Sequence, residues 1–424
     1  MNRMSFVLSI ALVFVAGCSR GFSSSSGVVP TMGHASSSSA QYAILYAFKG
    51  KGDGAYPQSA LVAENGVLYG TTSGQLDEAT DYGTVFSITT AGAERVLHRF
   101  RGGSDGSQPI AALAAIKGVL YGSTYQGGAG YGSLFRVGAD GSGYHILHRF
   151  GGTSKSDGAE PAGALLLVGQ TLYGTTQRGG NTGNGTFFRM NIDGSAYKVL
   201  YSFAGVGARD AANPEGTLVR VNGLLYGTSY YGGTTCPASP TYGCGAVFTV
   251  SDSGSERVVY RFSANGRNDG ANPVEAGLLW FNGLLYGTTS QNASSNCFSG
   301  TGCGVLFTMT TSGSERVIHR FGPLGTANGA TPEAGLIALN ETLYGSTLGG
   351  GTGGPGGGNG AVFETSPTGS ESAIYSFGGP SVGDGAQPNG VITFGGALYG
   401  TAQIGGNVSC ANANGCGVVF RIVP

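Results

Sequence analysis

The stretch Leu68-Tyr69-Gly70-Thr71-Thr72 decides the fold, because close copies of it recur along the 424-residue chain. The copies place their tyrosines 52 to 60 residues apart, at Tyr121, Tyr173, Tyr226, Tyr286, Tyr344 and Tyr399. A period of this length predicts one supersecondary unit per repeat, stacked against its neighbours in a single array.

One unit, residues 53–100, predicts two β-hairpins. Asp53-Gly54-Ala55-Tyr56-Pro57 is typical of a turn, since Asp bonds nearby backbone and Gly accepts a positive φ. We expect strands at 59–63, 67–72, 83–88 and 94–100, with the turn Asn65-Gly66 joining the first two. Each repeat is therefore expected to form a four-stranded antiparallel sheet.

Other landmarks recur as often as the tyrosine. The third expected strand carries Phe86, Phe135, Phe188, Phe248, Phe307, Phe363 and Phe420. The turn ends at Pro57, Pro109, Pro161, Pro214, Pro273, Pro332 and Pro388.

The order of the strands at the two ends of the array predicts ring closure. Residues 42–48 resemble the fourth strand of a unit, whereas residues 418–423 resemble the third. We expect these segments to pair and complete a shared blade. The sequence thus predicts an all-β, seven-bladed β-propeller of four-stranded blades, rather than an open solenoid or a parallel β-helix.

The repeated pattern also resembles a known family. Leu-Tyr-Gly-Thr-Thr, then Gly-Gly, then Gly-x-Val-Phe over residues 42–424 is similar to the GloVer tandem repeat of bacterial exported proteins. That resemblance implies a repeat array, export and a surface anchor, and it implies no activity. A looser likeness to Kelch blades in Gly179-Gly180 and Gly232-Gly233 lacks the recurring Trp of those blades, since Trp280 is the single Trp of the chain.

Composition excludes some classes of partner. The 81 glycines fall at turns, and hydrophobic residues make up 40 % of the chain, so a folded β-rich core is expected instead of disorder. The formal net charge is −1 and there is no long basic run, so we expect no nucleic-acid partner. No motif predicts a cofactor.

The first 40 residues have the features of a targeting segment followed by a flexible tether. Residues 1–17 combine a basic start with a short apolar run, and Val15-Ala16-Gly17-Cys18 looks like a bacterial lipobox. We expect a signal peptide over 1–17, lipidation at Cys18, a Ser-rich tether over 18–40 and the propeller over 41–424. The alternative is an ordinary secretory signal that is cut nearby. With Ser19 after the cysteine, an outer-membrane or cell-surface lipoprotein is expected, with the membrane as a partner through the anchor.

The remaining six cysteines fall into three local pairs, Cys236 with Cys244, Cys297 with Cys303, and Cys410 with Cys416. Each later cysteine stands in Gly-Cys-Gly just before the third strand of its repeat. In an exported protein this spacing predicts three disulfides that staple long loops. A zinc site is the alternative, but the spacing lacks CxxC and a nearby His, so we predict no metal.

Two repeated positions carry titratable groups. His98, His148 and His319 occupy a fourth-strand position where other repeats have Tyr, which indicates a structural role. The turn before the inner strand carries Asp53, Asp105, Asp157, Asp210, Asp269 and Asp384, with Asn328 in the remaining repeat. These side chains either cap their own turns or, as with Asp210 and Asp269, are candidates for ligand binding at one mouth of the channel.

Residues that differ between repeats are stronger functional candidates. Near the turn proline, repeats 3 to 6 carry Glu160, Glu215, Glu275 and Glu333, which predicts an acidic arc at the channel mouth. Such carboxylates could act on a sugar, bind a cation or be solvated surface charge. Tyr230 and Tyr231 are candidates for stacking on a sugar ring.

Two repeated features are expected to be structural. Glu94-Arg95, Glu256-Arg257 and Glu315-Arg316 begin the outermost strand, where we expect both charges to protect an exposed edge. Tyr69 and its equivalents are expected to pack between blades, and Gly70 to let two backbones approach.

We therefore predict an exported, lipid-anchored propeller that binds a glycan or a surface protein. A carbohydrate-active lyase or hydrolase with acidic residues at the mouth is the second hypothesis, and a purely structural envelope protein the third.

Overall fold

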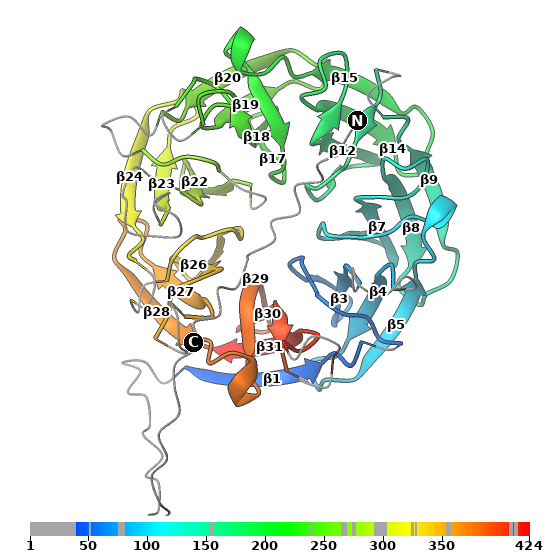
Figure 1. The fold of residues 1–424 in the computed structure, drawn as a ribbon, viewed down its shortest axis with the longest axis vertical. Coiled ribbons are helices and arrows are strands. Elements are labelled where there is room, and N and C mark those ends of the chain that lie inside the picture. The colour runs from blue at the N-terminus through cyan, green and yellow to red at the C-terminus, as the bar shows by residue number, and fades with distance from the viewer. Residues whose placement is uncertain are drawn as a thin grey trace, which may run out of the picture. The chain divides into compact units, whose positions relative to one another are not determined.

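The computed structural model describes residues 40–50, 52–74, 81–152, 156–236, 239–263, 269–273, 277–291, 303–323, 326, 329–352, 358–406, 410 and 414–424. Over residues 40–424 these form a ring of seven antiparallel sheets, each running from an inner to an outer strand (Figure 1). The predicted seven-bladed propeller is confirmed.

The strands of blades 1 to 4 follow chain order from the inside outward. Blade 1 contains β2 (Val62–Glu64), β3 (Val67–Thr72), β4 (Thr84–Ile88) and β5 (Glu94–Arg99), and blade 2 contains β6 (Ala114–Ile116), β7 (Val119–Thr124), β8 (Ser133–Gly138) and β9 (His145–Arg149). Blade 3 contains β11 (Leu166–Val168), β12 (Thr171–Thr176), β14 (Thr186–Asn191) and β15 (Lys198–Ser202), beside a two-stranded sheet of β10 (Gly158–Ala159) and β13 (Arg178–Gly179). Blade 4 contains β17 (Val219–Val221), β18 (Leu224–Gly232), β19 (Ala246–Val250) and β20 (Glu256–Arg261), and a fifth strand, β16 (Ala211–Pro214), also pairs with β18.

Blades 5 and 6 repeat this order, and blade 7 uses both ends of the propeller. Blade 5 contains β21 (Leu279–Phe281), β22 (Leu284–Thr289), β23 (Val305–Met309) and β24 (Glu315–Arg320), and blade 6 contains β25 (Ile337–Leu339), β26 (Thr342–Thr347), β27 (Ala361–Thr365) and β28 (Glu371–Ser376). Blade 7 contains β29 (Gly385–Phe394), β30 (Ala397–Gly405), β31 (Val418–Val423) and, as its outer strand, β1 (Gln41–Ala47).

The ring closes where β1 pairs with β31. Ala43 lies opposite Arg421 and Ile44 opposite Phe420 in an antiparallel register. Figure 1 shows β1 and β31 side by side, the one from the start of the propeller and the other from its end. The pairing predicted for these segments is therefore confirmed.

The inner strand is shorter than expected. The prediction began it at Ser59, but β2 pairs with β3 only from Val62 to Glu64. The residue before the turn proline has a φ between 51° and 58° in each blade: Tyr56, Gln108, Glu160, Asn213, Asn272, Thr331 and Gln387. In blade 1 this left-handed residue interrupts the regular ladder, although the Tyr56 carbonyl still accepts the Ser73 N–H of its own blade at 3.0 Å.

The backbone N–H of each left-handed residue donates to the preceding blade. The backbone N–H of Asn272, for example, donates to the carbonyl of Cys244 at 2.8 Å. The following proline then packs on a glycine of that same blade, so that a Cβ on Gly245 would lie 2.6 Å from Pro273 Cδ. The Asp-Gly-x-x-Pro turn and the Gly before the third strand thus form one inter-blade contact.

The tyrosine of the opening motif packs between blades, as expected. Tyr69 of blade 1 belongs to a buried cluster with Leu120 and Phe135 of blade 2, and the Tyr226 hydroxyl donates to the carbonyl of Thr311 in the next blade at 3.3 Å. The role expected for Gly70 was wrong. A Cβ there would lie 2.6 Å from Phe86 Cζ and 2.9 Å from Leu61, so the glycine seats an aromatic ring of its own blade.

The Glu-Arg pairs at the start of the outer strands divide between two environments. Arg95 and Arg257 are exposed, whereas Glu94 and Glu256 are half-buried. Burial, with Asp53 nearby, raises the pKa of Glu94 to about 7. Glu256 likewise has its pKa raised to about 7 by burial and by Asp210. The expectation that both members charge the edge therefore holds for the arginines and is wrong for the glutamates.

Candidate functional site

The inner ends of the blades surround a small cavity on the ring axis. It has a volume of about 170 Å³, and the segments that line it come from six of the blades in the described chain. Ala60, Ala112 and Ala164 are typical of the lining, while its polar side chains are Gln58, Ser59, Thr217, Glu333 and Asn389. The residue that follows the Leu-Tyr-Gly-Thr-Thr motif of the second strand varies from blade to blade, between serine, tyrosine, glutamine and leucine.

On blades 2 and 3, the turn of one blade meets the strand end of the other. The Tyr125 hydroxyl, just beyond β7, donates to Glu160 Oε2 at 2.9 Å and lies 3.1 Å from Gln177 Oε1. Arg178 Nε lies 2.9 Å from the same Glu160 oxygen. Glu160 is the left-handed residue before Pro161, and this backbone aims its side chain at the neighbouring strand end. The Arg178 side chain is 57 % exposed, so the group faces solvent.

On blade 4, three tyrosines form a continuous aromatic group. The Tyr230 and Tyr231 rings stand edge to face with centroids 4.7 Å apart, and Tyr242 lies 5.2 Å from Tyr231. Tyr242 is 60 % exposed. It belongs to the loop closed by the Cys236–Cys244 disulfide, and its carbonyl accepts the Gly232 N–H at 2.7 Å. The disulfide loop therefore holds an exposed ring against the two half-buried ones.

Electrostatic effects join these groups into one site. Burial raises the pKa of Tyr230, and Tyr231, Glu215 and Glu333 add to the effect. Burial and Glu215 also raise the pKa of Tyr231, which Arg178 opposes. Glu215 also adds to the raised pKa of Tyr125, so its carboxyl group lies within electrostatic range of tyrosines on blades 2 and 4. We call the group Tyr125, Glu160, Arg178, Glu215, Tyr230 and Tyr231 the mouth cluster.

The predicted site residues fall into three sets. Glu160, Glu215, Tyr230 and Tyr231 come together in the mouth cluster, and Glu333 lines the axial cavity close enough to act on Tyr230. Glu275 lies outside the residues that the structure describes. Asp210 and Asp269 lie elsewhere, in buried turns.

The buried aspartates tie each turn to the outer strand of the preceding blade. Asp210 accepts the Tyr201 hydroxyl at 2.9 Å and the Ala204 N–H at 2.7 Å. Asp269 accepts the Tyr260 hydroxyl at 2.8 Å, and His148 lies in the same way 3.2 Å from Asp157. The carboxylates of these turns therefore have hydrogen-bond partners within the fold. The histidine of blade 2 contacts the aspartate of the next turn, as the tyrosines at the equivalent position of blades 3 and 4 do.

Two of the predicted disulfides are present. Cys236 bonds Cys244, and Cys410 bonds Cys416. Cys303 is also disulfide-bonded, whereas Cys297 lies outside the described residues. Such bonds persist in oxidising compartments, which indicates a location outside the cytoplasm. Cys18, the expected lipidation site, also lies outside the described residues.

Two other classes of feature are absent from the described part of the chain. No group of three or more His, Cys, Asp or Glu side chains gathers there as a metal site. No helix in those residues has the length and apolar character to cross a bilayer.

The sequence analysis missed Tyr125, Arg178 and Tyr242. Tyr125 occupies the position after the Thr-Thr pair, where the blades carry Ser73, Tyr125, Gln177, Tyr230, Ser290, Leu348 and Gln403. Aligning the repeats at this position would have shown that blades 2 and 4 carry tyrosine. Tyr242 follows no repeat pattern, because it stands in a loop insertion.

Comparison with known proteins gives a family and a fold. The Gloeobacter/Verrucomicrobia repeat model matches residues 13–236 and 77–301, which together span more than half of the chain. The protein belongs to this repeat family. No curated protein matches its sequence significantly.

Solved structures with similar folds share little sequence with this repeat protein. A chain of a nidogen/laminin complex is 15 % identical, with a TM-score of 0.43 over 70 % of this chain and 91 % of that one. A gluconolactonase from Xanthomonas campestris is 14 % identical, with a TM-score of 0.39 over 72 % and 86 % of the two chains. TolB from Acinetobacter baumannii is 10 % identical, with a TM-score of 0.42 over 75 % and 63 %. At these values the likenesses carry no functional argument.

Proposed function

We propose that this repeat protein is a lipid-anchored propeller of the cell envelope that binds a glycan at the mouth cluster. The observation that carries the proposal is the convergence of Tyr125, Glu160, Glu215, Tyr230 and Tyr231 from three consecutive blades. Loops and strand ends on a rigid ring are common positions for binding groups. The membrane partner follows from the lipobox at Cys18, and the disulfides support export.

The chemistry of the cluster suits a sugar chain. Tyrosine rings offer apolar faces to the C–H groups of a pyranose, with a hydroxyl at the ring edge. Glutamate and glutamine oxygens accept hydrogen bonds from sugar hydroxyls, and Arg178 donates them. The cluster holds two glutamates and one arginine, with Glu333 nearby, so neutral or amino sugars should bind better than acidic ones.

A glycan array tests the proposal. We expect the propeller to retain neutral or amino glycans, and Tyr230→Ala or Tyr231→Ala to weaken binding by about 1 to 2 kcal/mol, because the stacking surface is lost. Gln403→Ala is the matched control, since it changes the equivalent position of blade 7. If no glycan is retained, or if Gln403→Ala weakens binding as much as Tyr230→Ala, the proposal is wrong.

A carbohydrate-active enzyme is the second hypothesis, and the mouth cluster supports it less well. A general acid or base needs a carboxyl group that can reach the substrate. Glu160 is already engaged by Arg178 and by the Tyr125 hydroxyl. Product analysis of every glycan that is retained would detect cleavage and would decide between binding and hydrolysis.

A further inference from the structure

We infer that the outer wall of blades 1 to 5 is a second binding surface, and that it takes a linear acidic polysaccharide. The wall is made by the outermost strands β5, β9, β15, β20 and β24, which form the periphery of the ring in Figure 1. Their outward positions carry eight of the 22 lysines and arginines of the chain: Arg95, Arg99, Arg149, Lys198, Arg257, Arg261, Arg316 and Arg320. We call these residues, with His145, the basic belt.

The belt arises from strand alternation. In β5 the residues Arg95 and Arg99 are exposed, whereas Glu94 and His98 are half-buried and Leu97, between the two arginines, is buried. Two arginines four residues apart on a strand are separated by about 13 Å. The equivalent alternate positions of the other four strands are basic or apolar, apart from Ser202 in β15, and none of them is acidic.

Several arginines of the belt donate to backbone carbonyls, although Arg95 also acts on the Asp140 carboxylate and Arg261 on that of Glu256. Arg149 Nη2 donates to the carbonyl of Ser104 at 3.3 Å, and Arg261 Nε donates to the carbonyl of Arg209 at 2.9 Å. Arg99 donates in the same way to the carbonyl of Gly52. A carbonyl orients a guanidinium but carries no formal charge, so these groups keep their attraction for anions.

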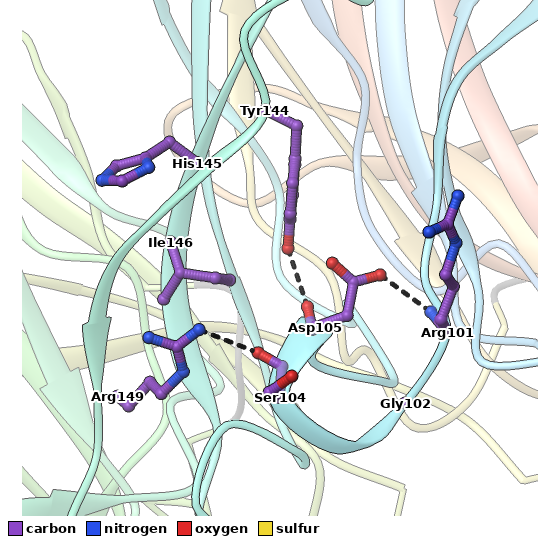
Figure 2. A pocket seen from close by; sticks show the side chains of 8 residues that line it. All are labelled: Arg101, Gly102, Ser104, Asp105, Tyr144, His145, Ile146 and Arg149. Atoms are coloured by element: carbon purple, nitrogen blue, oxygen red, sulfur yellow. Dashed lines mark hydrogen bonds between the residues drawn. The ribbon is translucent and has the colours of Figure 1, made fainter.

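A cavity between blades 1 and 2 is the best-defined subsite on the belt. It has a volume of about 440 Å³, and its lining includes Arg101, Ser104, Tyr144, His145 and Arg149. Figure 2 shows Arg149 reaching from its strand toward Ser104, Arg101 on the other side of the loop, and the His145 ring pointing away from that loop. The carboxylate of Asp105 accepts the Arg101 N–H at 2.9 Å and lies 3.3 Å from His98. The cavity can therefore receive one carboxylate or sulfate group of a polymer.

Edge protection alone does not explain the belt. The outermost strand of every blade has an unpaired edge, and charged side chains do protect such edges. Blades 6 and 7 have edges too, yet their outward positions carry Ser372, Ser376, Ala43 and Ala47. Edge protection also has no requirement for one sign of charge.

The shape of the wall decides between classes of anionic partner. A flat lipid surface can touch only a part of a convex wall at one time, whereas a flexible chain can follow it over five blades. A location outside the cytoplasm favours an acidic polysaccharide over nucleic acid. This inference does not depend on the mouth cluster, which contains none of the belt residues.

Affinity measured against salt concentration tests the inference, with polygalacturonate as the acidic probe and unmodified dextran as the neutral one. We expect the propeller to bind polygalacturonate and not dextran, with log affinity falling linearly against log salt. The variant Arg101→Gln/His145→Gln/Arg149→Gln should bind on the order of a hundredfold more weakly at about 0.1 M salt. For this variant the slope of log affinity against log salt concentration should be smaller by about 2, because the contacts of two arginines with the polymer are lost.

Two further variants keep the test falsifiable. Ser372→Arg/Ser376→Arg extends the belt onto blade 6 and should strengthen binding, whereas Arg136→Gln, outside the belt, should leave it unchanged. Thermal unfolding shows that each variant folds. Equal binding of dextran, an unchanged slope in the triple variant, or tighter binding to duplex DNA or to phosphatidylglycerol vesicles would overturn the inference. Tyr230→Ala should leave polygalacturonate binding intact, which separates this surface from the mouth cluster.

Discussion

Gly245 of blade 4 and Pro273 of blade 5 are in contact across the blade junction, so that a Cβ on the glycine would lie 2.6 Å from Pro273 Cδ and 2.5 Å from the Ser229 carbonyl oxygen. Equivalent glycine–proline contacts occur at all seven junctions, at 2.4 to 2.7 Å from the glycine's ideal Cβ to the proline Cδ. The contact joins neighbouring blades through the same two motifs that repeat in the sequence.

Gly245→Ala should destabilise the propeller. The φ of Gly245 is 89°, which costs an L-residue about 1 to 2 kcal/mol, and overpacking against Pro273 should add about 1 to 3 kcal/mol. Urea unfolding measures the loss. Gly223→Ala is the matched control, because its φ is 85° but nothing lies within 4 Å of the added Cβ. Equal losses in the two variants would contradict a role for the proline contact.

Gly287→Ala tests the seat of the third-strand phenylalanine. A Cβ at Gly287 would lie 2.6 Å from Phe307 Cζ, so we expect a loss of about 1 to 3 kcal/mol in the free energy of unfolding. In the double variant Gly287→Ala/Phe307→Leu the added methyl group has room. The two losses should therefore be less than additive in a double-mutant cycle. Strict additivity would show that the ring and the glycine act independently.

The half-buried glutamates predict that stability depends on pH. The pKa of Glu256 is raised to about 7 by burial and by Asp210, above its ordinary value of 4.5. The folded protein therefore binds a proton that the unfolded chain has lost, and this contribution is present below pH 4.5 and disappears as the pH rises through 7. Relative to the wild type, Glu256→Gln should gain roughly 1 to 3 kcal/mol between pH 5 and pH 8.

Urea unfolding of both proteins at the two pH values provides the measurement. Burial lowers the pKa values of His98 and His319, so these histidines make stability rise with pH, opposite to Glu256. Both proteins contain the two histidines, so their effect cancels in the difference between wild type and variant. A stability difference that does not change with pH would show that Glu256 titrates normally.

The Cys236–Cys244 disulfide should stabilise both the fold and the aromatic group. Replacing both cysteines by serine opens a loop with a sequence separation of 8, which should cost roughly 2 to 3 kcal/mol. It should also increase hydrogen exchange at the Gly232 amide, whose acceptor is the Tyr242 carbonyl. Cys410→Ser/Cys416→Ser is the control, and it should leave exchange at Gly232 unchanged.

Much of the fold could be predicted because the same physical constraints recur in each blade. Val67 to Thr72 and Val418 to Val423 were predicted with the bounds that β3 and β31 have. The inner strand could not be predicted, since its start depends on a left-handed residue and on a hydrogen bond to another blade. Neither the left-handed conformation nor the hydrogen bond to another blade can be recognised from the pattern of apolar residues around Ser59.

The candidate site was predicted only in part. Glu160 and Glu215 stood out because they differ from the equivalent residues of other repeats, and Tyr230 because an aromatic ring in a loop can stack on a sugar. Tyr125 belongs to the preceding blade, so its contact with Glu160 depends on the width of the junction, which a sequence does not specify, whereas Arg178 approaches Glu160 within blade 3, where Ala159 pairs with Arg178. The basic belt was missed for another reason, because the net charge of −1 sums over a molecule that keeps its exposed cations and its inward glutamates on different faces.

The pairing of β1 with β31 has a consequence for biogenesis. The first strand of the propeller to leave a ribosome or a translocon waits for β31, the last of the propeller strands to emerge, so blade 7 cannot be completed before residues Val418 to Val423 have been synthesised. Until then the ring has two open sides, and the hydrophobic faces of blades 1 and 6 remain uncovered. The core is therefore completed only after β31 has emerged. A chain that is cut short before Val418 would be left with an open ring that proteases can recognise.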